Sequence, residues 1–299
     1  MSKREKLDFI MNGLMGRYKD RVNDVNKILK ACINKGLIEK GEDIENDHIA
    51  FRTMGVNHLG IKSFEKIFLH YGYTRKEHLF FEGKKLDAYW YSPPESRYPR
   101  IFVSELRVGD LSSKAQQIIA KYTDQVKADP VDFLDLDDPI AIDHFLHSPL
   151  WSLPSLEDYD ILNEESEYAA WVIYNRYYLN HYTISVHNLP QGYNTIVDFN
   201  EFLESISIKL NRAGGLIKTS GDGLLLQSSS VAQLVDAEFA GGVKRKIPGS
   251  YVEFAERKVL PQFGHLDKED IRRIHRRDGF ETANADKIFE STYLDQVLN

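Results

Sequence analysis

The feature that most constrains the fold of this 299-residue chain is a strand–helix–strand–strand–strand order that occurs twice. Short runs of alternating apolar and polar residues predict the strands, and apolar residues at helical spacing predict the helices. The first copy predicts strands at 47–53, 79–81, 87–91 and 100–108 and a helix at 61–71. The second copy predicts strands at 182–186, 216–219, 224–228 and 251–257 and a helix at 197–213.

The segments outside the two copies carry helical patterns. The first forty residues repeat apolar positions at helical spacing, a largely helical insert occupies 111–179, and a last helix is predicted at 268–277. We therefore expect an α+β fold in which residues 1–299 form a single domain. Its two modules would span approximately 45–110 and 180–258, with additional helices at both termini.

Composition limits the partners and the location of the chain. A net charge of −7 argues against a general nucleic-acid binder, which needs a basic surface to neutralise phosphates. The sequence contains no run of 18 apolar residues, so neither membrane spanning nor secretion is expected. Its single cysteine, Cys32, cannot form a disulfide within the chain, which fits a reducing, cytoplasmic location.

The first predicted strand places two chemically useful side chains on one face. His48, Ala50 and Arg52 are spaced two apart and share that face, because side chains alternate along a strand. The apolar Ile49 and Phe51 point the other way. Ala50 is small and leaves room, and the guanidinium of Arg52 can bind a carboxylate through two hydrogen bonds. We therefore expect a metal ligand, His48, beside a carboxylate-binding Arg52.

The second copy offers the remaining candidate ligands. His181 opens its first strand, at the position that corresponds to His48 in the first copy. His187 lies six residues further on, about 20 Å along an extended strand, so one ion is not expected to bind both. Glu253 lies in the last predicted strand between two apolar residues that face away from it. The predicted metal ligands are therefore His48, His181 and Glu253.

Two histidines and one carboxylate form the ligand set of non-haem Fe(II) oxygenases, which leaves coordination positions for a substrate and O₂. Zinc hydrolases use the same ligand types, so the ligands alone do not decide the metal. Each residue also has a structural interpretation, since a strand histidine is often a hydrogen-bonded core residue and a strand glutamate is often half of a salt bridge. His144 and His147 form a weaker pair that lacks an obvious carboxylate.

Five segments together resemble the 2-oxoadipate dioxygenase/decarboxylase family. They are HIAFRT at 48–53, FVSEL at 102–106, NHYT at 180–183, IPGSYVEFA at 247–255 and DGFETANADKIFEST at 278–292. The resemblance runs from about residue 5 to residue 295 and is closest to a compact form of the family.

The resemblance implies an architecture of the vicinal-oxygen-chelate type, in which two βαβββ modules form a half-barrel around a metal. It implies Fe(II) as the cofactor, with His48, His181 and Glu253 as ligands and Arg52 as the residue that holds a substrate carboxylate. Gln227 resembles a pocket-lining, substrate-binding strand residue, for which a plain structural hydrogen bond is the alternative. Glu105 occupies the corresponding last strand of the first module, where an outer or structural role is expected rather than metal binding.

The implied activity is similar to that of hydroxymandelate synthase. A 2-oxo acid such as 2-oxoadipate would react with O₂ to give CO₂ and a 2-hydroxy acid such as 2-hydroxyglutarate, a step in lysine breakdown. Two alternatives stay open. One is a non-oxidative lyase, isomerase or hydrolase of the same fold, with Zn or Ni as the metal, and the other is a ligand-binding module without catalysis. The sequence predicts no oligomeric state.

Overall fold

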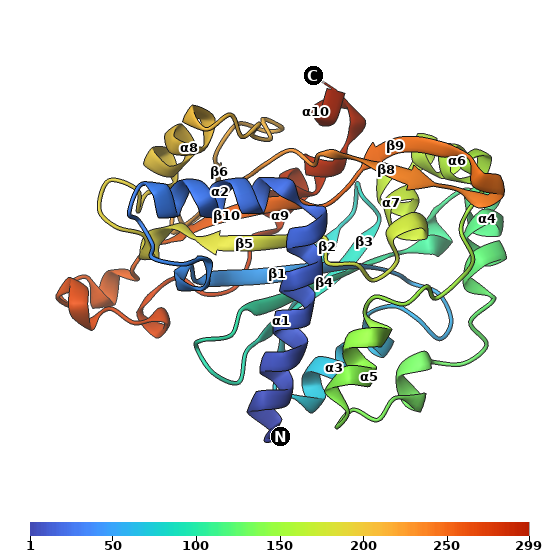
Figure 1. Ribbon diagram of the computed structural model, residues 1–299, viewed down its shortest axis with the longest axis horizontal. Coiled ribbons are helices and arrows are strands. Elements are labelled where there is room, and N and C mark those ends of the chain that lie inside the picture. Colours follow the sequence, from blue (N-terminus) through green and yellow to red (C-terminus); the bar gives the residue numbers. More distant parts are fainter. Residues whose placement is uncertain (299) are drawn as a thin grey trace.

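The computed structural model describes residues 1–298 and is built around one eight-stranded sheet (Figure 1). The strands follow the order β2-β3-β4-β1-β5-β10-β7-β6 across the sheet. Their bounds are β1 (Asn46–Met54), β2 (Thr74–Phe81), β3 (Leu86–Ser92), β4 (Arg100–Leu106), β5 (His181–Ser185), β6 (Lys218–Thr219), β7 (Leu225–Ser229) and β10 (Tyr251–Arg257).

The two halves of this sheet have the same topology. β1 pairs with β4 in parallel, β5 pairs with β10 in parallel, and β1 and β5 meet antiparallel at the centre. From the centre outward, each half therefore contains its first, last, third and second strand. The helices α3 (Ile61–His70) and α8 (Ile196–Ser205) follow the first strand of each half. The doubled βαβββ order and the α+β class predicted from the sequence are thus confirmed.

One hairpin within the second module was not predicted. The strands β8 (Leu234–Glu238) and β9 (Lys244–Pro248) form a separate antiparallel pair between β7 and β10. Its basic residues face acidic ones, because Lys246 pairs with Asp236 across the hairpin and Arg245 pairs with Asp160. This basic segment therefore has intramolecular counter-charges.

Helices cover both faces of the central sheet. The helices α1 (Lys3–Arg21) and α2 (Asn23–Asn34) lie on one face, where Figure 1 shows α1 crossing in front of β1 and α2 lying over β10. Tyr18 of α1 packs against Tyr182 of β5 with ring centroids 6.3 Å apart. The helix α9 (Thr282–Phe289) lies on the opposite face and contacts β2, β6 and β7. The helical N-terminus expected from the sequence is confirmed.

The insert between the modules is helical, as expected. It contains α4 (Ser113–Thr123), α5 (Pro139–Phe145), α6 (Leu156–Glu165) and α7 (Glu167–Asn175), and the chain ends in α10 (Leu294–Leu298). The 3₁₀ turns are η1 (Gly41–Asp43), η2 (Val108–Asp110), η3 (Pro130–Phe133), η4 (Val186–Asn188), η5 (Ala240–Gly242), η6 (Pro261–Phe263), η7 (Lys268–Asp270), η8 (Arg273–His275) and η9 (Glu290–Thr292). None of the helices within residues 1–298 is both long and apolar enough to cross a membrane.

Two predicted helices differ from the structure. The helix predicted at 197–213 ends at Ser205, because Ser207 adopts a left-handed φ of 58° and breaks the helical path. The helix predicted at 268–277 is wrong, since that segment forms only the short turns η7 and η8. Its arginines bind backbone carbonyls instead of lining a helix face, as when Arg273 donates to the carbonyls of Ser96 and Tyr98.

Candidate metal centre

Three side chains from three neighbouring strands meet on the face of the sheet that α9 covers. His48 of β1, His181 of β5 and Glu253 of β10 each offer a ligand atom, and these atoms lie within 4.8 Å of one another. Glu253 Oε2 is 3.4 Å from His48 Nε2 and 3.1 Å from His181 Nε2. All three side chains are buried. Within the described chain this is the one group of three or more His, Cys, Asp or Glu that could hold a metal ion.

The strand register explains why these residues converge. His181 pairs with Ala50 across the central antiparallel ladder, next to His48 on the same face of β1. Glu253 pairs with Thr183, two residues beyond His181 on the parallel ladder. Residues two apart on a strand share a face, so all three side chains point to the same side. The sequence could predict which side chains share a face of one strand. Only the pairing of the three strands brings the three side chains close together.

Outer hydrogen bonds orient the cluster. Asp47 Oδ2 is 2.8 Å from His48 Nδ1, and Asn180 Oδ1 is 3.1 Å from His181 Nδ1, so each ring turns its Nε2 toward Glu253. Partners on the second ring nitrogen are characteristic of metal-binding histidines, because they fix the tautomer and the ring orientation. Gln227 Nε2 donates to the second carboxylate oxygen of Glu253 at 2.6 Å. All three candidate ligands are therefore held in place by neighbours.

Asp47 was not identified from the sequence, although it is the most strongly bound of these neighbours. Arg257 contacts both of its carboxylate oxygens, through Nε at 2.7 Å and Nη2 at 2.9 Å, and Arg100 Nη1 lies 3.2 Å from Oδ1. Burial alone would raise the pKa of Asp47, but the two arginines hold it well below its usual value. Asp47 is therefore an anion that binds His48 on one side and two cations on the other.

The charges within the cluster differ from residue to residue. Burial would raise the pKa of Glu253, but His48 and His181 hold it well below its usual value. Burial would lower the pKa of His48, but Glu253 and Asp47 raise it above its usual value. For His181 burial dominates and lowers the pKa to about 4. The cluster thus combines a carboxylate, a histidine that readily holds a proton and a neutral histidine.

This donor set fits a divalent metal ion. Two imidazole nitrogens and one carboxylate oxygen match the ligand preferences of Fe(II) and Zn(II), and three protein ligands leave positions for a substrate. A metal would also take the place of any proton on His48 Nε2, which lies 3.0 Å from Thr183 Oγ1 and 3.4 Å from Glu253 Oε2, and such an exchange is ordinary at metal sites. The three residues could therefore hold a metal, and the geometry alone leaves its identity open.

The other histidines considered in the sequence lie outside the cluster. His187 belongs to the turn η4 and not to the strand, and its Nδ1 accepts from the backbone N–H of Arg257 at 3.2 Å. His147 Nδ1 contacts the carbonyl of Asp143, and His144 contacts Ser148. These residues have structural partners of their own.

Glu105 also has a structural partner. Its Oε2 accepts the backbone N–H of Ile61, the first residue of α3, at 2.7 Å. A carboxylate at a helix N-terminus is stabilised by the helix dipole. Gly60, with a φ of 84°, leaves the space in which this carboxylate approaches the helix.

Arg52 lies on the same face of β1 as His48 but makes no ion pair within residues 1–298. Its Nη1 donates to Thr292 Oγ1 at 3.1 Å and its Nη2 to the carbonyl of Phe289 at 3.2 Å, while its Nε has no partner. The rings of Tyr168 and Trp171 lie about 5 Å from the guanidinium, and its side chain is 1% exposed. Arg52 is thus a buried cation whose direct hydrogen-bond and ring contacts are with neutral groups.

The cluster faces a small cavity of about 20 Å³. Gln227 lines this cavity, together with the aromatic residues Phe102, Tyr251, Phe280 and Phe289 that were not predicted. The ring of Phe280 meets the ring of His48 edge to face at 4.8 Å. Phe280 also borders a cleft of about 380 Å³ on the outside of the molecule. It therefore separates the candidate ligands from solvent.

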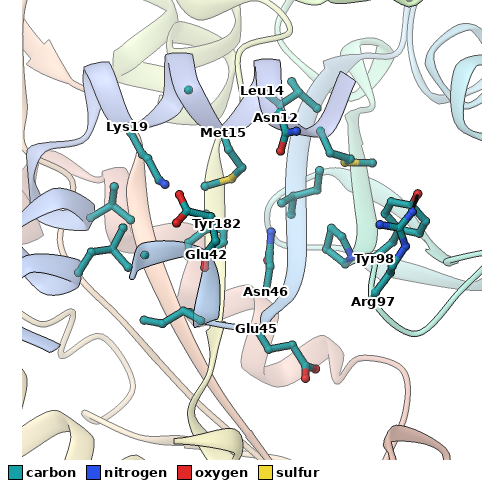
Figure 2. Close-up of a pocket in the computed structure, with 18 of the residues that line it drawn as sticks. Asn12, Leu14, Met15, Lys19, Glu42, Glu45, Asn46, Arg97, Tyr98 and Tyr182 are labelled. Atoms are coloured by element: carbon teal, nitrogen blue, oxygen red, sulfur yellow. Dashed lines mark hydrogen bonds between the residues drawn. The ribbon is translucent and has the colours of Figure 1, made fainter. Parts of the chain in front are cut away.

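A hollow of about 860 Å³ lies on the opposite face of the sheet. Figure 2 shows Met15 and Lys19 entering it from α1, and Asn46 and Glu45 at the start of β1. Ile49 lines it, one residue from His48, which alternates to the other side of the strand. This hollow contains none of the candidate ligands and is distinct from the metal centre.

Comparison with known proteins supports one family. A model of the 2-oxoadipate dioxygenase/decarboxylase family matches residues 10–266. A protein from Arabidopsis thaliana named "2-oxoadipate dioxygenase/decarboxylase, chloroplastic" is 46% identical over 262 residues, which is 84% of this chain and 69% of that protein.

Solved structures agree with this match. The crystal structure of the hydroxyglutarate synthase from Oryza sativa in complex with 2-oxoadipate is 41% identical, with a TM-score of 0.90 over 100% of this chain and 96% of that chain. A protein from Ralstonia eutropha named for the glyoxalase superfamily is 20% identical, with a TM-score of 0.70 over 90% of this chain and 83% of that chain, and shares the fold alone. The vicinal-oxygen-chelate fold expected from the sequence is thereby confirmed, and the chain belongs to the 2-oxoadipate dioxygenase/decarboxylase family.

Proposed function

We propose that this enzyme is an Fe(II)-dependent dioxygenase and decarboxylase that converts 2-oxoadipate, or a close 2-oxo acid, with O₂ into 2-hydroxyglutarate and CO₂. The observation that carries the proposal is the buried His48–His181–Glu253 cluster with an unpaired arginine, Arg52, on the same face of the sheet. The rice relative is described in complex with 2-oxoadipate, which supports a small 2-oxo acid as the substrate.

His48, His181 and Glu253 would hold the metal, because they fit a divalent ion and are oriented from behind by Asp47, Asn180 and Gln227. When bound there, Fe(II) would supply electrons and the coordination positions at which a 2-oxo acid and O₂ can meet. The ligand types alone also suit Zn(II), so the choice of Fe(II) rests on the oxygenase chemistry of the family.

Arg52 would bind a carboxylate of the substrate. A buried guanidinium without a counter-ion is costly, and a carboxylate offers it two parallel charge-assisted hydrogen bonds. Tyr168 and Trp171 pack around its charge and keep the guanidinium in position. The fixed fork of an arginine would set the orientation of the acid relative to the metal ligands, which a lysine would do less well.

The aromatic wall of the cavity would exclude water from the reacting groups. Phe280 and Phe289 border the cavity from outside the sheet, and Phe102 of β4 borders it from the sheet itself. A dry site strengthens the electrostatic contacts of a bound acid and protects reactive species from solvent. Gln227 would act mainly through Glu253, since its amide donates to that carboxylate.

O₂ consumption by the Fe(II)-loaded protein, measured against a panel of 2-oxo acids headed by 2-oxoadipate, tests this function. We expect uptake coupled to CO₂ release with 2-oxoadipate, and the panel would rank the other acids. Stoichiometric iron without O₂ uptake for any acid would favour a non-oxidative lyase, isomerase or hydrolase. Binding of the acids without turnover under any metal would favour a ligand-binding module.

An Arg52→Lys variant separates the substrate role of Arg52 from the metal site. We expect the KM for 2-oxoadipate to rise by roughly tenfold or more, because the bidentate contact is lost, while metal affinity stays close to that of the parent. An unchanged KM would remove Arg52 from the substrate site.

Several broader expectations also belong to this proposal. Residues 1–299 would act as a single catalytic domain, since the strands of both modules form one sheet. The product would enter lysine breakdown. A cytoplasmic location, inferred from the single cysteine, stays a prediction, and the plant relative named above carries a chloroplast location in its name.

A further inference from the structure

Tyr251 is a buried residue of the metal centre whose hydroxyl finds no acceptor among residues 1–298. It lies on β10 two residues before Glu253 and is completely buried. Its ring packs on the ring of His181 with centroids 4.8 Å apart and an interplanar angle of 34°. Tyr251 also lines the cavity that the candidate ligands face. Its hydroxyl oxygen is among the buried polar atoms without a partner.

An orphan hydroxyl in this position is unusual, because a buried tyrosine normally finds a partner for its O–H group. Leaving such a group unsatisfied is unfavourable, and nothing about packing requires it, since phenylalanine would fill the same space. The guanidinium of Arg52 lies close to this hydroxyl, whose oxygen can accept a hydrogen bond from it. The O–H of Tyr251 is then still without an acceptor, and it stands next to a buried cation.

Arg52 lacks the same kind of partner. Its Nε has no hydrogen-bond partner within residues 1–298, and the carboxylate of Glu167 acts on it electrostatically without a direct ion pair. A phenol O–H and a guanidinium N–H are both donors. Two adjacent buried donors without an acceptor define a site for an acceptor with negative charge, and a carboxylate meets both requirements.

The strand register locates this donor pair relative to the metal ligands. Ala50, His181 and Tyr251 lie in one row across β1, β5 and β10, because Ala50 pairs with His181 and His181 pairs with Tyr251. Arg52 lies two residues beyond this row on β1, and His48 lies two residues before it. An acid that reaches from the metal ligands to Arg52 would therefore pass over Ala50 and alongside Tyr251.

We propose that Tyr251 determines substrate specificity by donating a hydrogen bond to the distal carboxylate of a 2-oxo dicarboxylic acid, the same carboxylate that Arg52 pairs with. This inference rests on the proposed function and deepens it, since it assigns the recognition of the second carboxylate to two named donors. A 2-oxo acid with an apolar end would leave both donors unpaired, and a site built for a hydrogen-bonding group discriminates strongly against analogues that lack it.

A Tyr251→Phe variant tests the inference, with Tyr177→Phe as the matched control. Tyr177 is also buried and also has a hydroxyl without a partner, but it packs against Phe64 and Phe145, away from the metal centre. Binding of 2-oxoadipate and of 2-oxohexanoate, which has the same carbon number but one carboxylate, is measured by calorimetry on the Zn(II)-loaded proteins. The redox-inert metal removes any dependence on turnover.

We expect Tyr251→Phe to weaken the binding of 2-oxoadipate by roughly tenfold to a hundredfold, as for the loss of one hydrogen bond to a charged group. Its binding of 2-oxohexanoate should be unchanged, and Tyr177→Phe should bind both acids as the parent does. The melting temperature of either variant should be no lower than that of the parent, since each loses an unsatisfied hydroxyl. A purely structural Tyr251 would instead lower the melting temperature and weaken both acids alike.

Two failures can be told apart. If the parent binds 2-oxoadipate and Tyr251→Phe binds it equally well, the role of Tyr251 is overturned while the proposed function stands. If the Zn(II)-loaded parent binds neither acid, the proposed substrate class is wrong, and the inference about Tyr251 falls with it.

Discussion

The two βαβββ modules offer equivalent positions but fill them with different chemistry. Each module has a histidine near the start of its first strand, His48 or His181, whose ring faces the metal centre. Two residues further along the ladder, the last strand presents Phe102 in the first module and Glu253 in the second. Duplication of the frame therefore supplies two similar nitrogen ligands, and only one module adds a carboxylate.

The residues behind the two histidines differ as well. Asp47 precedes His48 and is an anion between two arginines, whereas Asn180 precedes His181 and is neutral. Four residues after the histidine the first module has Arg52 and the second has Ser185. The first module thus contributes the cation proposed to bind substrate, and the second contributes the anionic ligand. A symmetric site would have the same residues in both modules. The positions at which the modules differ therefore include the carboxylate proposed to bind the metal and the arginine proposed to bind the substrate.

The largest effect on metal affinity should follow from removing His181, the histidine ligand of the second module. Losing a residue that only hydrogen-bonds to a metal ligand lowers metal affinity by up to roughly a hundredfold. His181 is itself a candidate ligand, so we expect His181→Ala to lower metal affinity by more than that. His187→Ala is the control, because His187 binds the backbone N–H of Arg257 and lies outside the cluster. Metal titration of both folded variants measures this, and equal losses would refute the choice of His181.

The next largest effect should follow from neutralising Asp47, the anion that contacts His48 and has no counterpart behind His181. We expect Asp47→Asn to lower the free energy of unfolding by about 3–5 kcal/mol, because Arg257 and Arg100 would lose the counter-ion of a buried pair. Metal affinity should also fall by roughly tenfold to a hundredfold, since His48 loses its orienting partner. Denaturant unfolding and metal titration give the two values. A stable variant with full affinity would mean that Asn at 47 suffices, as Asn180 does in the other module.

The pH dependence of metal binding should distinguish the two histidines. The pKa of His48 is raised by Glu253 and Asp47 against the effect of burial, whereas burial lowers that of His181 to about 4. Metal must therefore displace one proton, from His48, as the pH falls below the raised pKa. Affinity should decrease by about tenfold per pH unit in that range. Calorimetry in buffers of different ionisation enthalpy counts the protons, and release of two protons would contradict the assignment.

The sequence could predict what local periodicity determines. The alternation of β1 indicated correctly that His48 and Arg52 share a face, because a side chain's direction depends only on its own strand. The helix predicted at 268–277 failed because the arginines there bind distant carbonyls, a requirement that spacing does not reveal. Asp47 was missed for the same reason, since its partner Arg257 is 210 residues away.

Tyr251 illustrates the second limit of sequence reasoning. The strand that Tyr251 begins was predicted, but an unsatisfied hydroxyl depends on all the residues that surround it. Only the packed structure shows that Arg52, on a different strand of the other module, is its neighbour. A motif can therefore identify ligands, while recognition of the substrate's far end depends on contacts between modules.

The smallest effect tests a position at which the modules remain alike. Glu105 accepts the backbone N–H of Ile61 at 2.7 Å, and its counterpart Glu256 accepts that of Ile196 at 2.8 Å, so each caps the helix of its own module. We expect Glu105→Gln and Glu256→Gln each to lower the free energy of unfolding by about 1 kcal/mol, the usual scale for a charge at a helix N-terminus. Neither should change metal affinity.

Denaturant unfolding and metal titration of this matched pair check the expectation. Both carboxylates make the same contact, so equal losses of stability would mean that both have the same structural role, which is to cap the helix of their own module. A loss of metal affinity in Glu105→Gln alone would instead give the first module a carboxylate role of its own at the metal. The first module would then also supply a carboxylate ligand, and fewer coordination positions would stay open for a substrate.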